Sequence, residues 1–239
     1  MFVVSGIPAI ACGPADARFT TKVASAFAPE RHTVSILGVY KDGQMSSDAW
    51  GTIAPRISPA LGASACEAAY ADSGLSTSAP VNASMNAGLS SAIDDYARAN
   101  GPTDELLARL APAAKGDLVI VFTLAGKLPA QKPKDSPASL STGSPTGGGA
   151  LGGGPRGGHR PSFASGVDSN ELDISASFFS VPQKRSVGLV AMQYSGVSVD
   201  DAVDKFSARL AQALPNARCE GWDWNAKIDV DAIRQSIDH

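Results

Sequence analysis

Residues 117–126, DLVIVFTLAG, decide the fold class of this 239-residue chain. The apolar run from Leu118 to Leu124 is broken only by Thr123, and it does not alternate with polar residues. Runs of this kind are typical of a strand that is buried on both faces of a sheet. The segment therefore predicts the central strand of a sheet with helices packed on it.

Two alternating segments within 171–196 flank the turn at 182–185 and predict a β-hairpin with one buried face. Its apolar positions are Leu172, Ile174, Ala176, Phe178, Val187, Leu189 and Ala191. Ser198 and Asp201 then form a capping-box-like pair, which starts a predicted helix that ends near Leu214.

On the amino-terminal side, 32–40 (HTVSILGVY) predicts a strand. Ser46 or Ser47 caps the helix that follows, and Pro55 and Pro59 predict a kink or interruption in it. The remaining predictions are a weak strand at 64–70, helices at 85–101, 104–116 and 228–237, and an edge strand at 217–224.

These segments predict a single α/β domain at 32–239, with a mixed sheet flanked by helices. A flexible insertion at 129–170, rich in Gly, Pro and Ser, interrupts this domain between the central strand and the hairpin. Residues 1–31 are expected to be a signal-like or tether segment.

The amino terminus, MFVVSGIPAIAC, is apolar and loosely resembles a bacterial lipobox that ends in a lipid-bearing Cys12. It has no basic region before the apolar run and is short for a signal peptide, so a plain apolar arm is the alternative. If Cys12 is lipidated, Cys66 and Cys219 remain as an even pair that is able to form a disulfide in an oxidising compartment. If 1–12 is not a signal segment, the protein is cytoplasmic.

The insertion contains G-x-G-x-x-G at Gly147, Gly149 and Gly152, the pattern of a dinucleotide-binding turn. Such a turn works only between a strand and a helix, where helix amides meet the pyrophosphate. The glycine-rich residues that follow Gly152 cannot nucleate a helix. We therefore expect an accidental match and no nucleotide site.

Charge distinguishes the insertion from the rest of the chain. The net charge of the protein is -3, which argues against general nucleic-acid binding. Within 127–166, five basic residues face one acidic residue. The insertion is predicted to be either a solvated tether or a contact to an anionic surface or partner through Arg156, His159 and Arg160.

No arrangement of residues in the sequence predicts catalysis, a metal site or a cofactor. The neighbouring carboxylates Asp94–Asp95 and Asp200–Asp201 point in different directions on a helix, and we expect them to face solvent or cap helices. Trp222 and Trp224 alternate on the predicted edge strand. They are expected to pack in the core or, if exposed, to form a partner-binding hot spot.

The strand segment KGDLVIVFTLAG, the hairpin and the helix segment DDAVDKFSARLAQALP resemble bacterial envelope lipoproteins with a TolB amino-terminal-like domain, the LpoB-like group. The resemblance covers 32–128 and 171–216. It implies a periplasmic, membrane-tethered domain that binds another envelope protein and catalyses nothing. A long linker after Cys12 is missing, and the glycine-rich insertion is foreign to that group.

Our hypothesis is therefore a non-catalytic, lipid-anchored envelope protein that acts as a scaffold or regulator. The alternative is a soluble α/β enzyme or nucleotide-binding protein with 139–166 as a mobile lid, which a polar pocket beside Asp117, Asp173 or Ser195 would favour. A subunit of a larger assembly, with oligomers formed through the edge strand near Trp222, is the third possibility. The sequence does not set the oligomeric state.

Overall fold

The computed structural model describes residues 16–23, 31–70, 87–126, 170–196 and 198–237. The strands are β1 (Asp16–Val23), β2 (Thr33–Lys41), β3 (Gln44–Met45), β4 (Leu118–Gly126), β5 (Asn170–Ser180), β6 (Arg185–Gly196) and β7 (Arg218–Cys219). The helices are α1 (Ser47–Ala60), α2 (Ala87–Asn100), α3 (Asp104–Leu110), α4 (Val199–Ala213) and α5 (Val230–Gln235), with a 3-10 turn at Ala111–Ala113.

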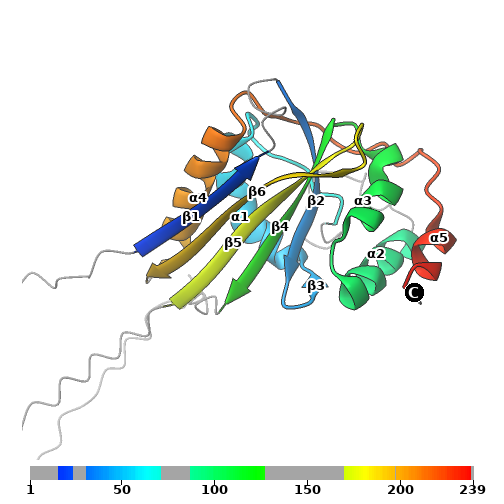
Figure 1. The fold of residues 1–239 in the computed structure, drawn as a ribbon, viewed down its shortest axis with the longest axis horizontal. Helices are drawn as coiled ribbons and strands as arrows, with labels where there is room; N and C mark the ends of the chain where they lie inside the picture. The colour runs from blue at the N-terminus through cyan, green and yellow to red at the C-terminus, as the bar shows by residue number, and fades with distance from the viewer. Residues whose placement is uncertain (1–15, 24–30, 71–86, 127–169, 197, 238–239) are drawn as a thin grey trace, which may run out of the picture.

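The strands form one mixed sheet in the order β1-β6-β5-β4-β2-β3, and β7 pairs with β2 (Figure 1). Strand β2 runs parallel to β4 and β7, whereas β1, β6, β5 and β4 pair antiparallel with one another and β3 pairs antiparallel with β2. The predicted single α/β domain with a mixed sheet is confirmed. The topology joins an antiparallel half, β1 to β4, to a half built around parallel β2.

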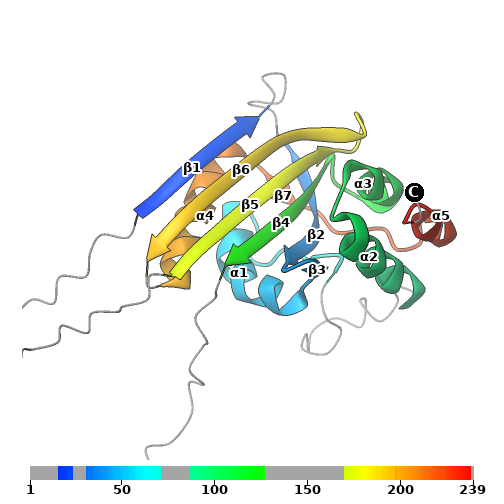
Figure 2. The same cartoon turned by 60° about the horizontal axis from the view of Figure 1, so that its bottom comes forward.

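Helices pack on both faces of the sheet, but not to the same extent. Helices α1 and α4 cover one face, where the Phe122 ring stacks on Trp50 at 5.9 Å and meets Phe206 edge-on at 6.5 Å. Helices α2, α3 and α5 lie on the other face, next to β2 and β4 (Figure 2). Val119 and Phe179 belong to this second core.

The central strand and the first strand of the hairpin confirm the sequence patterns, whereas the second strand corrects them. Residues Leu118 to Phe122 are fully buried, because their side chains alternate between the two cores. In β5 the alternation of Leu172 to Phe178 places the apolar side chains under α1 and α4.

Strand β6 follows after a four-residue turn and pairs with β5 over its whole length. In β6 the expected buried positions Leu189 and Ala191 lie on the face away from α1 and α4, and Val190, Met192 and Tyr194 are the core residues. A bulge at Val187 shifts the alternation by one residue and is the cause of this difference.

Strand β1 lies within residues 1–31, which we expected to be a signal-like or tether segment. Asp16 pairs with Ser195 and Val23 with Gly188, so eight residues before the expected domain boundary belong to the sheet. A period-two pattern, in which Ala17 and Phe19 alternate with polar residues, is the signal that would have indicated this strand.

Three further expectations differ from the structure. Helix α1 is not interrupted at Pro55 or Pro59, and the packing of Trp50, Ile53 and Ile57 holds it against the sheet. The weak strand expected at 64–70 is reduced to one bridge between Ala68 and Ile36. The edge strand expected at 217–224 is only the two-residue β7, followed by one bridge from Trp222 to Ala114.

Candidate functional site

Four antiparallel strands leave one surface of the domain without a helix over it within the described residues (Figure 2). We call this surface the open face. Its side chains are those of the alternate positions that do not point into the core under α1 and α4. They are Asp16, Arg18, Thr20 and Lys22 of β1, Leu189, Ala191, Gln193 and Ser195 of β6, Glu171, Asp173, Ser175 and Ser177 of β5, and Thr123 and Ala125 of β4.

Strand register arranges these residues in rows across the sheet. One row runs from Arg18 through Gln193 and Asp173 to Ala125. The middle rows consist of short side chains such as Ser175, which make the surface flat. Antiparallel sheets commonly solvate one face, and a flat polar face is also suited to lie against another protein.

Charge divides the open face into two ends. Asp16, Glu171 and Asp173 are exposed at one end, where Arg18 makes an ion pair with Asp16 at 3.3 Å. We call this the acidic end, and Lys22 lies at the opposite end of β1. The face therefore has an electrostatic direction along its strands.

Each end of the open face is hollowed. At the acidic end the hollow measures about 400 Å³ and is lined by Asp16, Arg18, Glu171, Asp173, Gln193, Tyr194 and Ser195. At the opposite end it measures about 520 Å³ and is lined by Lys22, Val23, Ser177, Ser186, Val187, Gly188 and Leu189. A polar hollow beside Asp173 and Ser195, the feature that would favour the alternative of an enzyme, is thus present as part of a broad surface.

The side chains at the acidic end are able to form hydrogen bonds and ion pairs with a ligand. Its carboxylates accept hydrogen bonds, Arg18 donates them, and the amide of Gln193 does both. Among the described residues, no group of three or more His, Cys, Asp or Glu side chains is placed to hold a metal ion. A separate hollow of about 620 Å³ lies beside α2, α3 and α5, and includes the Arg109–Glu105 ion pair at 2.7 Å.

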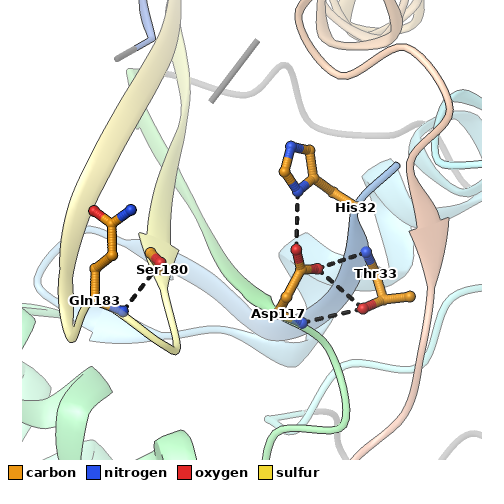
Figure 3. Close-up of polar contacts among 5 residues, drawn as sticks. All are labelled: His32, Thr33, Asp117, Ser180 and Gln183. Carbon is orange, nitrogen blue, oxygen red and sulfur yellow. Dashed lines mark hydrogen bonds and ion pairs between the residues drawn. The ribbon is translucent and has the colours of Figure 1, made fainter. Parts of the chain in front are cut away.

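Asp117 does not line the open face but joins the starts of β2 and β4 (Figure 3). Its carboxylate accepts hydrogen bonds from the Thr33 amide (2.6 Å) and hydroxyl (2.9 Å), and lies 2.9 Å from the buried Nδ1 of His32. Figure 3 draws Ser180 and Gln183 as a separate pair, joined by a 3.3 Å bond from the Gln183 amide. The cluster lies at the amino ends of parallel strands, whereas ligand sites in α/β sheets lie at the carboxyl ends.

The sequence patterns did not predict that His32 and Asp117 lie next to each other. Each residue stands at the start of an apolar strand, and β2 and β4 are parallel neighbours, so the two starts meet at one sheet edge. The topology, not either residue alone, brings them together. The cluster satisfies backbone and side-chain groups at that edge, which is a structural role.

A second polar cluster ties β6 to α4. The Tyr194 hydroxyl donates to Asp201 at 2.8 Å, and Lys205 donates to the same oxygen at 2.6 Å. Hydrogen bonds from Lys205 and then Tyr194 lower the pKa of Asp201 from its ordinary value. Burial, followed by the bond to Asp201, raises the pKa of Tyr194. Asp201 also lies in the first turn of α4, where its amide donates to the hydroxyl of the N-cap residue Ser198 at 3.3 Å.

The residues that the sequence indicated as candidate sites lie in different environments in the structure. Cys66 and Cys219 form a disulfide, with Cα atoms 5.7 Å apart. Trp222 is 4% exposed, and its Nε1 donates to the Ile36 carbonyl at 2.9 Å, so it packs in the core and is not an exposed hot spot. Trp224 stacks on it at 5.5 Å. Cys12, Arg156, His159 and Arg160 lie outside the described residues, as does the lid expected at 139–166.

The paired carboxylates serve local structure. Asp94 and Asp95 make ion pairs with Arg98 at 2.6 and 3.5 Å. Asp200 makes an ion pair with Arg56 of α1 at 3.1 Å. Asp201, the fourth of these carboxylates, is bound by Tyr194 and Lys205. Ion pairs of this kind on helix surfaces contribute little to stability.

The fold and the open face define a single-domain mixed α/β protein in which no described helix covers one side of the antiparallel half of the sheet. No protein-family model and no curated protein matches the sequence. The PelC dodecamer from Paraburkholderia phytofirmans is similar with a TM-score of 0.37 and 12% identity, over 85% of this chain and 99% of that one. A variant of that dodecamer has a TM-score of 0.34 and 14% identity, over 86% of this chain and 100% of that one. No described helix is long and apolar enough to cross a membrane.

Proposed function

We propose that the chain is a non-catalytic, lipid-anchored protein of the bacterial cell envelope, which acts as a scaffold or regulator by binding another envelope protein. In this proposal the domain is of the TolB amino-terminal type, lies in the periplasm and is tethered to a membrane through Cys12. The observation that carries the proposal is the open face, a flat polar half-sheet in a domain whose other sheet surface is packed under α1 and α4.

The position at which the chain enters the sheet supports a membrane tether near the acidic end of the open face. Asp16 is the first residue of β1 and lies at the acidic end of the open face, opposite Ser195. Cys12 precedes Asp16 by four positions. An extended chain covers about 3.5 Å per residue, so a lipid on Cys12 holds the acidic end within about 14 Å of its attachment point. A partner in the same membrane then meets the open face first.

Two other features support an envelope location and the domain type. The Cys66–Cys219 disulfide is of the kind that persists in oxidising compartments such as the periplasm. The segments that carry the resemblance to TolB amino-terminal-like domains are adjacent in space: β4 pairs with β5, β5 with β6, and α4 packs on β6.

Site-specific photo-crosslinking in intact cells tests the binding surface. A photoreactive residue at Ser175 or Gln193 lies on the open face, and one at Ser91, exposed on α2, is the matched control. We expect a membrane-protein adduct from the two open-face positions and none from Ser91. Equal adducts at all three positions, or none at any, contradict the proposed surface.

Mass spectrometry of the native amino terminus tests the anchor independently. We expect a chain that begins at Cys12 and carries a lipid, recovered with membranes. An unmodified Met1 on protein from the cytosol contradicts the proposed location.

A second candidate function rests on the hollow at the acidic end. A polar hollow beside Asp173 and Ser195 favours the alternative of a soluble enzyme or nucleotide-binding protein. In that case Arg18 is the group that would pair with a phosphate or carboxylate. Thermal unfolding across a nucleotide and metal panel separates the two functions: a rise in Tm that Arg18→Gln abolishes favours the enzyme, and an unchanged Tm favours the scaffold.

A further inference from the structure

Strand β1 is the long unpaired edge of the described sheet. At the other end of the sheet, β3 and β7 are two residues each, whereas β1 has eight. It pairs with β6 without a register shift, and it contains no proline. Edge strands present a row of unpaired amides and carbonyls, and proteins usually protect such edges with charged side chains, bulges or prolines. Strand β1 carries Asp16, Arg18 and Lys22, so the charges decide with which strand it is able to pair. A regular edge of this length is suited to pair with another strand.

The helix-side surface of β1 is apolar at its centre. Phe19 is 39% exposed and is the exposed large hydrophobic residue of the described chain. It pairs with Met192 of β6 on the face covered by α4. Helix α4 packs mainly on β6 and α1, and reaches β1 through a 3.0 Å bond from Arg209 to Thr21. Phe19 therefore stands at the margin of α4, beside the free edge.

Charges along β1 select one self-complementary register. Two copies related by a two-fold axis perpendicular to the sheet pair antiparallel, and each residue then opposes one of the same face. A pairing centred on Arg18 sets that residue against itself, and one centred on Thr20 sets Arg18 against Lys22. In a pairing centred on Phe19, Asp16 of each copy lies opposite Lys22 of the other copy, so this opposite-charge pair occurs two times. The two Phe19 residues lie opposite each other.

Both other neighbouring registers therefore place like charges opposite each other, and registers centred further along the strand shorten the overlap. Opposite charges in directly facing positions stabilise a strand pair, whereas like charges destabilise it. The pairing also sets the acidic end of one open face beside Lys22 of the other. Phe19 and its counterpart become buried between the two α4 helices.

We propose that β1 pairs antiparallel with β1 of a second copy of this chain, centred on Phe19, and joins two sheets into one continuous sheet. The partner is a second copy because the strand complements itself in charge. The two open faces lie on the same side and form one extended surface. The inference goes beyond the proposed function and does not depend on a lipid at Cys12.

Charge exchange tests the register. In full-length protein with Cys12→Ser, sedimentation equilibrium is measured for Asp16→Lys, Lys22→Asp and the double exchange. Each single change creates two like-charge oppositions, so we expect the dimer dissociation constant to rise on the order of 10-fold, and the double exchange to restore it. Lys227→Asp, an equal change at an exposed site away from β1, is the control and leaves the constant unchanged.

Cysteine crosslinking tests the centre of the pairing. Directly opposed residues have Cβ atoms about 4.5–5.5 Å apart, so Phe19→Cys in the Cys12→Ser chain is expected to give a disulfide-linked dimer under mild oxidation. Thr21→Cys opposes Ala17 and is expected to give none. A chain that stays monomeric up to about 1 mM overturns the proposal. A dimer whose dissociation constant is unchanged by the charge substitutions also overturns it, as does a dimer that crosslinks equally through Cys at positions 19 and 21. Loss of the dimer leaves the crosslinks from Ser175 and Gln193 as the separate test of the proposed function.

Discussion

Cys66 and Cys219, 153 positions apart in sequence, are joined by a disulfide that ties the segment after α1 to β7. The bond lies beside parallel β2, because Cys219 pairs with Val34. Cys66 is 7% exposed, and its amide donates to Ser58 at 2.9 Å. The disulfide thus closes a very long loop across the middle of the domain, beside a 3.2 Å hydrogen bond from the Cys219 amide to the Leu61 carbonyl.

The first prediction is that this disulfide contributes about 3–5 kcal/mol to the free energy of unfolding, because a long crosslinked loop restricts the unfolded chain. Replacing both Cys66 and Cys219 by Ser is expected to lower the denaturant midpoint accordingly, measured by tryptophan fluorescence. Cys12→Ser is the control and should leave the midpoint in place. Equal midpoints for the oxidised and the doubly substituted protein would show that the bond is energetically neutral.

The second prediction concerns pH. Lys205 and Tyr194 lower the folded-state pKa of Asp201, so its contribution to stability is fully present above the unfolded-state pKa and is lost as the pH falls through the lowered folded-state value. The stability difference between wild type and Asp201→Asn is therefore expected to shrink as the pH drops below about 4. Urea unfolding from pH 7 to pH 2 measures it. A difference that is constant over this range contradicts the linkage.

A matched pair of glycines provides the third prediction. A Cβ on Gly116 would lie 2.7 Å from the Ser35 amide nitrogen and the Thr33 carbonyl oxygen, backbone atoms that cannot move aside. Gly51 is exposed within α1 and has nothing within 4 Å of such a Cβ. Gly116→Ala is expected to destabilise the fold by several kcal/mol, as overpacking does, and Gly51→Ala to stabilise it by about 1 kcal/mol. Thermal unfolding measures the change in stability for each variant. A change of the same sign in both variants would refute the packing argument.

The fourth prediction compares Asp117, which we expect to contribute to stability, with Asp173, which we expect to contribute to partner binding. Asp117→Ala removes the acceptor of the Thr33 amide and hydroxyl, and is expected to cost about 1–3 kcal/mol of stability. Asp173 is exposed on the open face, so Asp173→Ala should leave the stability within about 0.5 kcal/mol. Partner crosslinking from Ser175 should weaken in the Asp173 variant only. Loss of crosslinking in a folded Asp117 variant would assign that cluster a role in binding.

The sequence predicts the central strand and β5 well because their signals are dense and local. In Leu118 to Leu124 nearly every residue is apolar, and in β5 the alternation is regular. In β6 a bulge at Val187 shifts the alternation by one residue, so counting from Val187 selects the wrong face for Leu189 and Ala191. Strand β1 carries a weaker pattern, in which Thr21 stands at a helix-side position beside the apolar Phe19. Its partner β6 lies far along the chain, so no local feature shows that the pairing exists.

The candidate site is harder to predict than the fold for the same reason. Arg18, Asp173 and Gln193 are ordinary polar residues in sequence, and only the strand order places them in one row. For Trp222 the sequence left core packing and an exposed hot spot as alternatives, and the structure confirms packing. Its indole nitrogen donates to the carbonyl of Ile36, and its ring fills the second core.

The fifth prediction concerns the segment between β4 and β5. Gly126 pairs with Leu172, so the two strands are antiparallel neighbours that a short turn is able to join. Replacing 127–169 by a four-residue Gly-Asn-rich turn is therefore expected to preserve the fold and raise the stability by about 2 kcal/mol through lower loop-closure entropy. Affinity purification from membranes then separates the two roles expected for the insertion. If the shortened variant recovers the same amount of partner, the insertion is a tether. If the shortened variant folds but loses the partner, and the full-length chain with Arg156→Ser and Arg160→Ser loses it too, the insertion is a basic contact.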